Sequence, residues 1–318
     1  MRLLITGATG MVGRSLLQHL AGLEFKVYAA LRRLVSELPA GVEAVQVGDI
    51  GPYTDWKTAL SGIDVVIHTA ARVHVMHDVC ASSLDEFRKV NVHGTLKLAQ
   101  QAAKLGVKRF VFISSIKVNG EETVLGQAFT ERDEPAPVDP YSISKYEAEQ
   151  GLLKMAEETG MEIVIIRAPL VYGPGVKANL FNLMRWLKMG IPLPLRKVHN
   201  KRTLLALGNL VDLIVTCIKH PAATNQIFLA GDGEDMSTTE LLTRMGMHLG
   251  KPARLIPVPQ KIIQICFKFI GRKDLAQRLC GSLQVNISKA RELLGWTPPV
   301  SVDEALQKTA RYFLESQI

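Results

Sequence analysis

Tyr141 and Lys145 are the residues of this sequence whose types and spacing best suit acid–base chemistry. A free phenol titrates near pH ~10, too high for easy proton transfer at neutral pH. An ammonium held close to the phenol favours the phenolate and lowers the pKa of the phenol. The two residues are four apart, and the helix-forming run that follows Lys145 places both side chains on one face of a helix. We therefore expect Tyr141 to move a proton and Lys145 to lower its pKa.

The start of the chain carries a pattern that suits a dinucleotide. An apolar strand at residues 2–5 precedes Gly7, Gly10 and Gly13, and an amphipathic helical stretch follows at residues 15–20. Glycines permit a tight turn and close approach of the backbone to a pyrophosphate, and a helix N-terminus adds partial positive charge. The spacing is Gly-x-x-Gly-x-x-Gly rather than Gly-x-Gly-x-x-Gly, so an ordinary glycine-rich turn is the alternative.

Together these two patterns resemble the short-chain dehydrogenase/reductase superfamily, in its extended branch of NAD(P)-dependent nucleotide-sugar epimerases and dehydratases. The resemblance runs nearly from end to end, and it is greatest to the UDP-glucose 4-epimerase-like subgroup that includes UDP-4-keto-sugar reductases. Further pieces that resemble the family follow in its order at residues 48–50, 64–71, 91–95, 112–115 and 167–174.

The resemblance implies a set of site residues. The catalytic residues it implies are Ser115, Tyr141 and Lys145. The cofactor-binding residues it implies are Gly7, Thr9, Gly10, Met11, Val12, Gly13, Arg32, Arg33, Asp49, Ile50, Thr69, Ala70, Ala71, Asn91, Tyr141, Lys145 and Pro169. The substrate-binding residues it implies are Ser115, Asn179, Arg202 and Arg278.

Arg32 and Arg33 bear on the choice of cofactor. An acidic residue at the end of the second strand would accept hydrogen bonds from the adenosine ribose and mark NAD. Here that strand ends in two guanidiniums, which can hold the 2′-phosphate of NADP. We therefore expect NADP, with NAD possible and a pair of solvated arginines as the alternative. By the resemblance, Asp49 lies near the adenine amino group.

Two activities remain open. By the resemblance, the Ser115 hydroxyl contacts the substrate oxygen beside Tyr141. Ile116 and Lys117 stand where the related dehydratases carry an Asp-Glu pair, which argues against dehydration. A UDP-4-keto-sugar 4-reductase is favoured, because a reductase draws on the reduced NADP pool. A UDP-glucose or UDP-N-acetylglucosamine 4-epimerase is the alternative, and a non-catalytic NADP sensor of the same fold is a third.

Several implied roles have competing explanations. Asn91 resembles a position in the family's proton relay, but an Asn-x-x-Gly turn explains it nearly as well. Arg202 matches a substrate-phosphate arginine, although it can also belong to a solvated strand edge. The substrate is expected to be a UDP-sugar, and a lipid-diphosphate sugar would meet the same arginines. Helices at residues 85–105 and 141–158 resemble those of the family's dimer interface, so a homodimer is expected.

Strand patterns alternate with helical ones through the first half. Strands are predicted at residues 26–31, 43–47, 65–68, 110–114 and 162–166, with helices between them. This alternation predicts an α/β fold, a Rossmann-type doubly wound parallel sheet. Residues 1–167 are expected to form the NAD(P)-binding domain. The proline-richer residues 168–318 are expected to form a smaller mixed C-terminal substrate-binding lobe, with chain crossings between the two.

Composition limits the possible partners. The 318 residues are 47% hydrophobic with a formal charge of +8, which suits a globular enzyme with an anionic ligand. The basic residues form no stripe with interleaved aromatics, so no nucleic acid is expected. Four cysteines without metal-ligand spacing indicate a reduced, cytoplasmic setting and no metal site. His68, His74 and His77 are too irregularly spaced to favour a metal. No apolar run reaches ~18 residues, so no integral membrane segment is expected; the apolar segment 261–270 suggests a buried helix more than a membrane-surface one.

Overall fold

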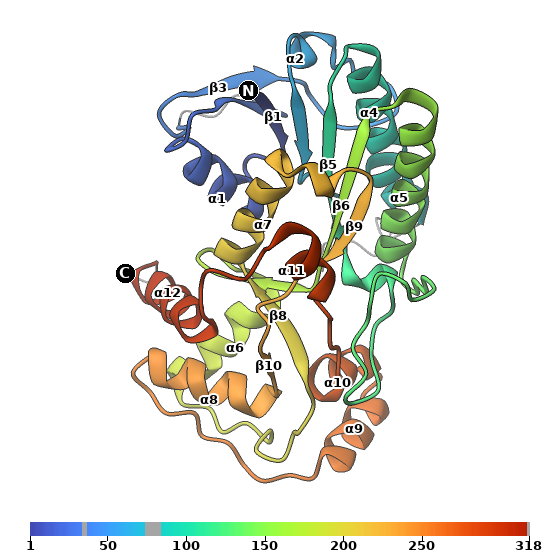
Figure 1. The fold of residues 1–318 in the computed structure, drawn as a ribbon. Coiled ribbons are helices and arrows are strands. Elements are labelled where there is room, and N and C mark those ends of the chain that lie inside the picture. The colour runs from blue at the N-terminus through green and yellow to red at the C-terminus, as the bar shows by residue number, and fades with distance from the viewer. Residues whose placement is uncertain (34–36, 74–83, 317–318) are drawn as a thin grey trace.

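The structure is a computed structural model that describes residues 1–33, 37–73 and 84–316. Its largest layer is a seven-stranded sheet with the order β3-β2-β1-β4-β5-β6-β9 (Figure 1), in which all neighbouring strands are parallel. The strands are β1 (Arg2–Thr6), β2 (Lys26–Leu31), β3 (Val42–Gln46), β4 (Val65–His68), β5 (Arg109–Ser115), β6 (Glu162–Ala168) and β9 (Gln226–Leu229). This order is that of a doubly wound dinucleotide-binding sheet, so the predicted Rossmann-type fold is confirmed.

Helices cover both faces of this sheet. One face is covered by α1 (Met11–Leu20) and α7 (Leu207–Lys219), and the other by α2 (Lys57–Leu60), α4 (Thr95–Lys104) and α5 (Pro140–Thr159). Successive side chains of a strand point to opposite faces. Leu3 and Ile5 therefore join the core beneath α1 and α7, whereas Leu4 joins the core beneath α4 and α5. Burial on both faces explains why the central strands are continuous apolar runs.

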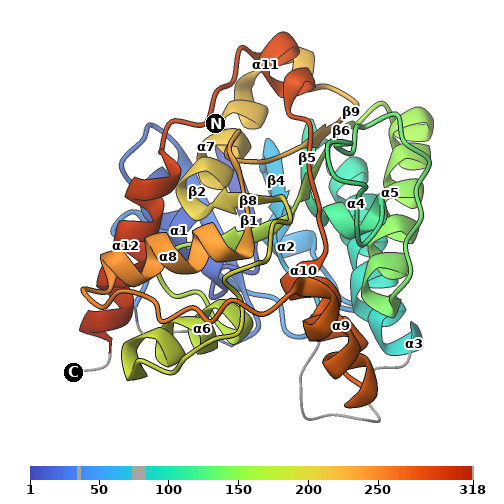
Figure 2. The same cartoon turned by 90° about the horizontal axis from the view of Figure 1, so that it is seen from below.

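A second, smaller layer follows the large sheet. Its three-stranded sheet has the order β10-β8-β7, formed by β10 (Asp235–Met236), β8 (Arg202–Ala206) and β7 (Leu170–Tyr172). It packs with α6 (Ala178–Met189), α8 (Thr238–His248) and α12 (Val302–Glu315), which Figure 2 shows grouped away from α4 and α5. Strand β9 and helix α7 lie later in the chain than β7, yet both pack in the large sheet's layers, and α11 (Ser288–Leu294) packs beside β9.

The helix predicted at residues 85–105 is interrupted in the structure. It consists of α3 (Leu84–Phe87), a π-helical turn at Arg88–Gly94, and then α4. A π-helical turn has i→i+5 hydrogen bonds and is often found at functional sites. Here the wider turn contains Asn91, whose side chain is buried. The turn ends at Gly94. A larger residue would be crowded there, because a Cβ would lie 2.7 Å from Ile50 Cγ2.

The expectation that residues 261–270 form a buried helix is wrong. They lie in α9 (Gln260–Phe269), which is joined to α10 (Lys273–Cys280) at the outer end of the smaller lobe. Ile263 is buried, but Ile262, Ile265 and Phe269 are exposed. The helix packs on the lobe through one face only, so its other apolar residues meet solvent. Among the described residues, no helix is both long and apolar enough to cross a membrane.

Candidate active site

The start of α5 is fixed by its own side chains. Asp139 caps the helix, because its Oδ1 accepts a hydrogen bond from the Ser142 amide (2.6 Å) while its own amide donates to Ser142 Oγ (3.1 Å). Pro140 occupies the first turn, where its missing N–H costs nothing. Tyr141 and Lys145 follow one turn apart on the same face, and Lys145 is only 1% exposed.

The pKa values of this pair differ from the sequence-based expectation. Burial raises the pKa of Tyr141 to about 12, and the nearby Asp139 carboxylate adds to the shift. Burial lowers the pKa of Lys145 to about 7, while Glu149 opposes that change. The Lys145 ammonium lies over the Phe112 ring, 4.0 Å from its centroid. The expected lowering of the Tyr141 pKa is therefore wrong here, because desolvation of the phenolate is the dominant effect.

An ion pair joins the turn after Ser115 to the start of the helix that contains Tyr141. Ser115 ends β5, and its Oγ accepts a hydrogen bond from the Lys117 amide (3.2 Å) in the short 3₁₀ turn Ile116–Val118. The Lys117 ammonium pairs with the Asp139 carboxylate and with Glu121 (3.1 Å). The turn that carries Ser115 is thus bonded to the cap that begins the Tyr141 helix. The sequence analysis considered Lys117 only as a missing dehydratase carboxylate and did not identify this role.

Asn91 connects the loop after β4 to α5. Its Oδ1 accepts a hydrogen bond from the Arg72 amide (2.8 Å), and its Nδ2 donates to the Arg72 carbonyl (3.0 Å) and to Ser144 Oγ (3.0 Å). Ser144 is the neighbour of Lys145 in the chain. Asn91 therefore holds two segments of the site together from within the π-helical turn.

A buried ion pair lies one turn beyond Lys145. Arg167 Nη2 donates to Glu149 Oε2 (2.6 Å), and Arg167 Nη1 donates to Asn119 Oδ1 (2.9 Å). Ser114 Oγ also donates to the Glu149 carboxylate, which is fully buried. Glu149 stands four residues after Lys145, so the same helical spacing that selected Tyr141 and Lys145 also pointed to this residue. The sequence analysis did not identify it.

The glycine loop after β1 fits a pyrophosphate. Gly7 has a φ of +69°, and a Cβ there would lie 2.6 Å from the Ala70 amide nitrogen in the loop after β4. A Cβ on Gly13 would lie 2.2 Å from the Gly7 carbonyl oxygen. Gly10 is the N-cap residue of α1 and has no side chain that could bond the first amides of the helix. Exposed amides at a helix N-terminus are suited to bind phosphate.

The other cofactor-binding candidates lie around this loop. Met11 and Val12 form the first turn of α1, and Thr9 is exposed beside them. Thr69 Oγ1 donates to the Thr6 carbonyl (2.7 Å), which joins the loop containing Thr69, Ala70 and Ala71 to the end of β1. Pro169 is buried directly after β6. All these residues follow the carboxyl ends of parallel strands, where doubly wound sheets bind ligands.

Arg32 and Asp49 form an exposed ion pair. Arg32 lies just after β2, and its Nη1 is 3.6 Å from Asp49 Oδ1. The two side chains are 73% and 86% exposed. A pair this exposed contributes little to stability. It lies at the carboxyl edge of the sheet, where doubly wound folds bind ligands. Arg33 is exposed beside it.

Arg202 and Arg278 lie near enough in the smaller lobe for the charge of one to act on the other. Arg202 begins β8 and donates from Nη1 to the Gly281 carbonyl (3.1 Å), at the end of α10, which contains Arg278. Burial and the neighbouring Arg278 guanidinium lower the pKa of Arg202. Among the described residues, neither guanidinium has a carboxylate partner. Two like charges held together favour an anion between them. The side chain of Asn179, near the start of α6, lies outside the described residues.

His68 is buried in the centre of the sheet. Its Nδ1 is 2.7 Å from Thr6 Oγ1, and its Nε2 is 2.9 Å from Thr95 Oγ1. Burial and the Lys145 charge lower the pKa of His68 to about 3, so the imidazole is neutral. His74 and His77 lie outside the described residues. Among those that are described, no group of His, Cys, Asp and Glu is placed to hold a metal.

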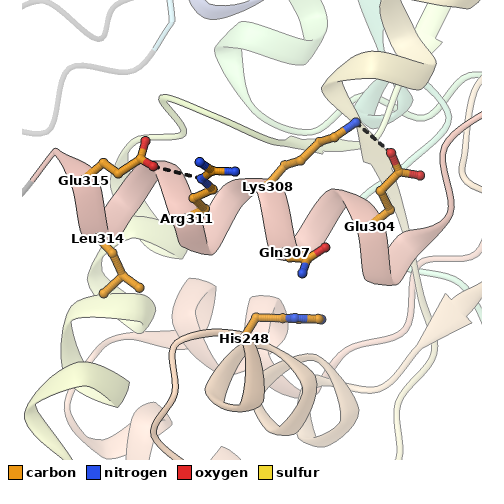
Figure 3. A pocket seen from close by; sticks show the side chains of 7 residues that line it. All are labelled: His248, Glu304, Gln307, Lys308, Arg311, Leu314 and Glu315. Carbon is orange, nitrogen blue, oxygen red and sulfur yellow. Dashed lines mark hydrogen bonds and ion pairs between the residues drawn. The ribbon is translucent and has the colours of Figure 1, made fainter.

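A hollow of about 630 Å³ between α8 and α12 is separate from these residues (Figure 3). Its charged side chains pair with one another: Lys308 Nζ with Glu304 (2.7 Å) and Arg311 Nε with Glu315 (2.9 Å). Figure 1 shows α8 and α12 on the side of the molecule away from α5. The hollow has no contact with Tyr141 or Arg202 and is not the candidate active site.

Comparisons with known proteins agree with this geometry. The profile of the NAD dependent epimerase/dehydratase family matches residues 3–231. A UDP-glucose 4-epimerase of Vibrio cholerae is 47% identical over 316 residues, which cover 99% of this chain and 96% of that protein. An N-acetyl-alpha-D-glucosaminyl-diphospho-ditrans,octacis-undecaprenol 4-epimerase of Escherichia coli O157:H7 is 27% identical, over 97% of this chain and 94% of that protein.

A solved structure shares the whole fold. The UDP-glucuronic acid 4-epimerase of Bacillus cereus, in complex with NAD, superposes with a TM-score of 0.78 over 100% of both chains, at 21% identity. At this level of identity the likeness establishes the fold.

Proposed function

Because the chain belongs to the NAD-dependent epimerase/dehydratase family, we propose that it is a UDP-sugar 4-epimerase acting on a UDP-hexose or UDP-N-acetylhexosamine. This choice reverses the order of preference reached from sequence, where a 4-keto-sugar reductase came first. The 47% identity to a UDP-glucose 4-epimerase over nearly the full chain supports the epimerase. The observation that supports a diphosphate-bearing substrate is the Arg202–Arg278 pair, two guanidiniums without a carboxylate partner among the described residues.

We assign the proton transfer to Tyr141. Its raised pKa keeps the phenol neutral at physiological pH, which suits donation of a proton to the sugar O4 when the ketone is reduced. The oxidation step runs the other way: the O4 hydroxyl gives its proton to Tyr141 in the phenolate form as hydride leaves C4. Reduction on the opposite face returns the proton to O4, so a complete epimerisation consumes none. Ser115 is proposed to hydrogen-bond O4, and Lys145 to position the cofactor's ribose and the phenol. A bound nicotinamide cofactor supplies a reversible hydride acceptor at C4.

NAD is the proposed cofactor. The Asp49 carboxylate already pairs with Arg32 and would repel the 2′-phosphate of NADP. Gly7, Gly10 and Gly13 would hold the pyrophosphate, with Thr9, Met11 and Val12 at the helix start. A 4-reductase with NADP is the second candidate, and the observation that favours it is the basic pair Arg32 and Arg33 at the end of β2.

We also propose that the two halves of the chain have different roles. Residues 1–167 contain the cofactor site, and residues 168–318 contain the substrate arginines. Residues 168–318 also contribute α7 and β9 to the layers of the large sheet. Association as a homodimer through α4 and α5 is proposed on the family resemblance, and light scattering of the purified protein measures it.

One experiment separates the two candidates. The cofactor of the purified protein is released by denaturation and identified by mass spectrometry, and UDP-glucose or UDP-N-acetylglucosamine is then incubated with native protein without added cofactor. An epimerase is expected to release NAD and to form the 4-epimer over many turnovers with no net change in reduced cofactor. A parallel assay adds NADPH and a UDP-4-keto-sugar. Consumption of one NADPH per ketosugar there, with no 4-epimer in the first assay, would identify the reductase.

A further inference from the structure

Helix α9 has two apolar faces, and only one of them packs on the protein. Ile263 is buried and Phe267 is partly buried in the core of the smaller lobe. Ile262, Ile265 and Phe269 follow a spacing of three and four residues, which places them together on another face. Their exposed fractions are 49%, 52% and 88%. A row of large apolar side chains in water is a feature of interaction surfaces rather than of ordinary protein surface.

The charged residues of α9 itself all have one sign, although Glu122 lies near Lys268 on the side of the helix that faces α10. Lys261 and Lys268 lie seven residues apart on the same side of α9, next to the apolar row, and Arg272 follows at the end of the helix. Residues 260–273 contain no Asp or Glu. A second copy of this face would bring lysines against lysines, which opposes self-association. The exposed face of α9 is complementary to a surface that has an apolar interior and a negatively charged outer layer.

An anionic lipid bilayer is such a surface. Long lysine side chains can reach from an apolar region to a layer of phosphates, and a short amphipathic helix binds in the plane of the interface. The ten residues of α9 are too few to span a bilayer. Figures 1 and 2 both show α9 at the periphery of the molecule, where no helix or strand of the described residues lies outside it.

We propose that α9 is a membrane-surface helix. Ile262, Ile265 and Phe269 enter the acyl-chain boundary of an anionic bilayer, and Lys261 and Lys268 contact the lipid phosphates. The adjoining helix α10 contains Arg278, whose charge acts on Arg202 and lowers its pKa together with burial. Docking of α9 therefore holds the arginine pair close to the bilayer, whichever diphosphate substrate it binds.

Vesicle binding by the full chain tests this proposal. Co-sedimentation is measured with phosphatidylcholine vesicles that contain or lack phosphatidylglycerol. The wild-type protein is expected to bind the anionic vesicles, and added salt should weaken that binding. The variant I265S/F269S should bind at least about tenfold more weakly. The matched control is M247S/L293S, which removes two exposed apolar side chains from α8 and α11, and it should bind like the wild type.

A second measurement does not depend on altering the apolar row. Cys266 is an exposed thiol on α9, and an environment-sensitive fluorophore attached there, in a C80S background, should shift to shorter wavelength only with anionic vesicles. Circular dichroism checks that every variant is folded. The proposal is overturned if the wild-type protein does not bind anionic vesicles above the neutral background, or if the fluorophore on Cys266 does not respond. It is also overturned if I265S/F269S changes only the oligomeric state, which would make α9 a protein interface.

Discussion

At the scale of single residues, burial rather than the neighbouring ammonium sets the state of the acid–base pair. Tyr141 and Lys145 share one helical face, yet loss of solvation raises the pKa of the phenol to about 12 and lowers that of the amine to about 7. Each group therefore favours its neutral form. Tyr141 is suited to donate a proton at neutral pH, and the charge of Lys145 is lost as the pH rises through about 7.

The substitution Tyr141→Phe tests the proton donor. The ring and its edge contact with Phe87 are kept, so the unfolding midpoint should be unchanged while kcat falls by ~10²–10⁴-fold. Tyr146→Phe, one residue beyond Lys145 on the same helix, is the matched control and should leave kcat unchanged. Near-normal turnover by the Tyr141→Phe protein would remove Tyr141 from the mechanism.

Arg202→Ala tests the substrate arginine. Loss of a charge-assisted phosphate contact costs ~1.5–3 kcal/mol, so KM for the UDP-sugar should rise by ~10–100-fold. The amount of cofactor released from the purified variant should not change. Arg196→Ala removes an exposed guanidinium of the same lobe and serves as the control. An unchanged KM in the Arg202→Ala protein would mean that this arginine only bonds the Gly281 carbonyl.

At the scale of elements, the site depends on how α5 begins. Asp139 caps the helix and also receives the Lys117 ammonium from the turn after β5. Burial opposes the charge on this carboxyl, but the hydrogen bonds from Lys117 and Ser142 lower its pKa overall. The carboxylate therefore stays ionised and fixes Tyr141, two residues further along, relative to Ser115.

Comparison of Asp139→Asn with Asp139→Ala separates the cap from the charge. Asparagine still accepts the Ser142 amide, whereas alanine removes the cap and should lower the unfolding free energy by ~0.5–2 kcal/mol. Both variants lose the ion pair between Lys117 and residue 139, while Glu121 remains beside Lys117, so kcat should fall in both. Urea unfolding and steady-state kinetics provide the two readouts. Full kcat in both proteins would show that the Lys117–Asp139 pair does not position Tyr141.

At the scale of the whole molecule, the second half of the chain supplies elements of the large sheet's layers. Helix α7 covers the same face of the large sheet as α1, and β9 lies beside β6, although both elements follow β7 in the chain. The core of the cofactor-binding layer thus includes residues from beyond position 167. In the middle of this layer His68 bridges β1 and α4 through Thr6 and Thr95.

His68 makes the folded state sensitive to acid. Its pKa is about 3 in the folded protein and near 6.5 when unfolded, so the unfolded chain binds more protons between these values. Stability should therefore be complete above about pH 6.5 and decrease as the pH falls towards 3, by at most about 1.4 kcal/mol per pH unit. Urea unfolding at about pH 7.5 and about pH 4.5 measures this loss.

The substitution His68→Gln removes the titrating group and should reduce the difference between the two pH values. The matched control is His93→Gln, which replaces an exposed imidazole in the neighbouring π-helical turn and should leave the wild-type difference. An identical pH dependence in the wild-type and His68→Gln proteins would assign the acid sensitivity to other groups.

The sequence by itself determined the order of strands and helices in the first half of the chain. The predicted strands at residues 26–31 and 65–68 coincide with β2 and β4, because runs of consecutive apolar residues fit only strands buried on both faces. The glycine turn and the one-face spacing of Tyr141 and Lys145 are equally local properties, fixed by backbone geometry over a few residues. These features were enough to predict the fold class and the family.

Only the tertiary structure decided the environments of those residues. The charge of Arg278 acts on Arg202, Lys117 pairs with Asp139, and one apolar face of α9 is exposed. No local sequence pattern relates the residues that meet in this way. The direction of the Tyr141 pKa shift was predicted wrongly for the same reason. A pKa depends on the solvent that packing removes and on charges brought near by the fold, and both are set by contacts between residues distant in sequence.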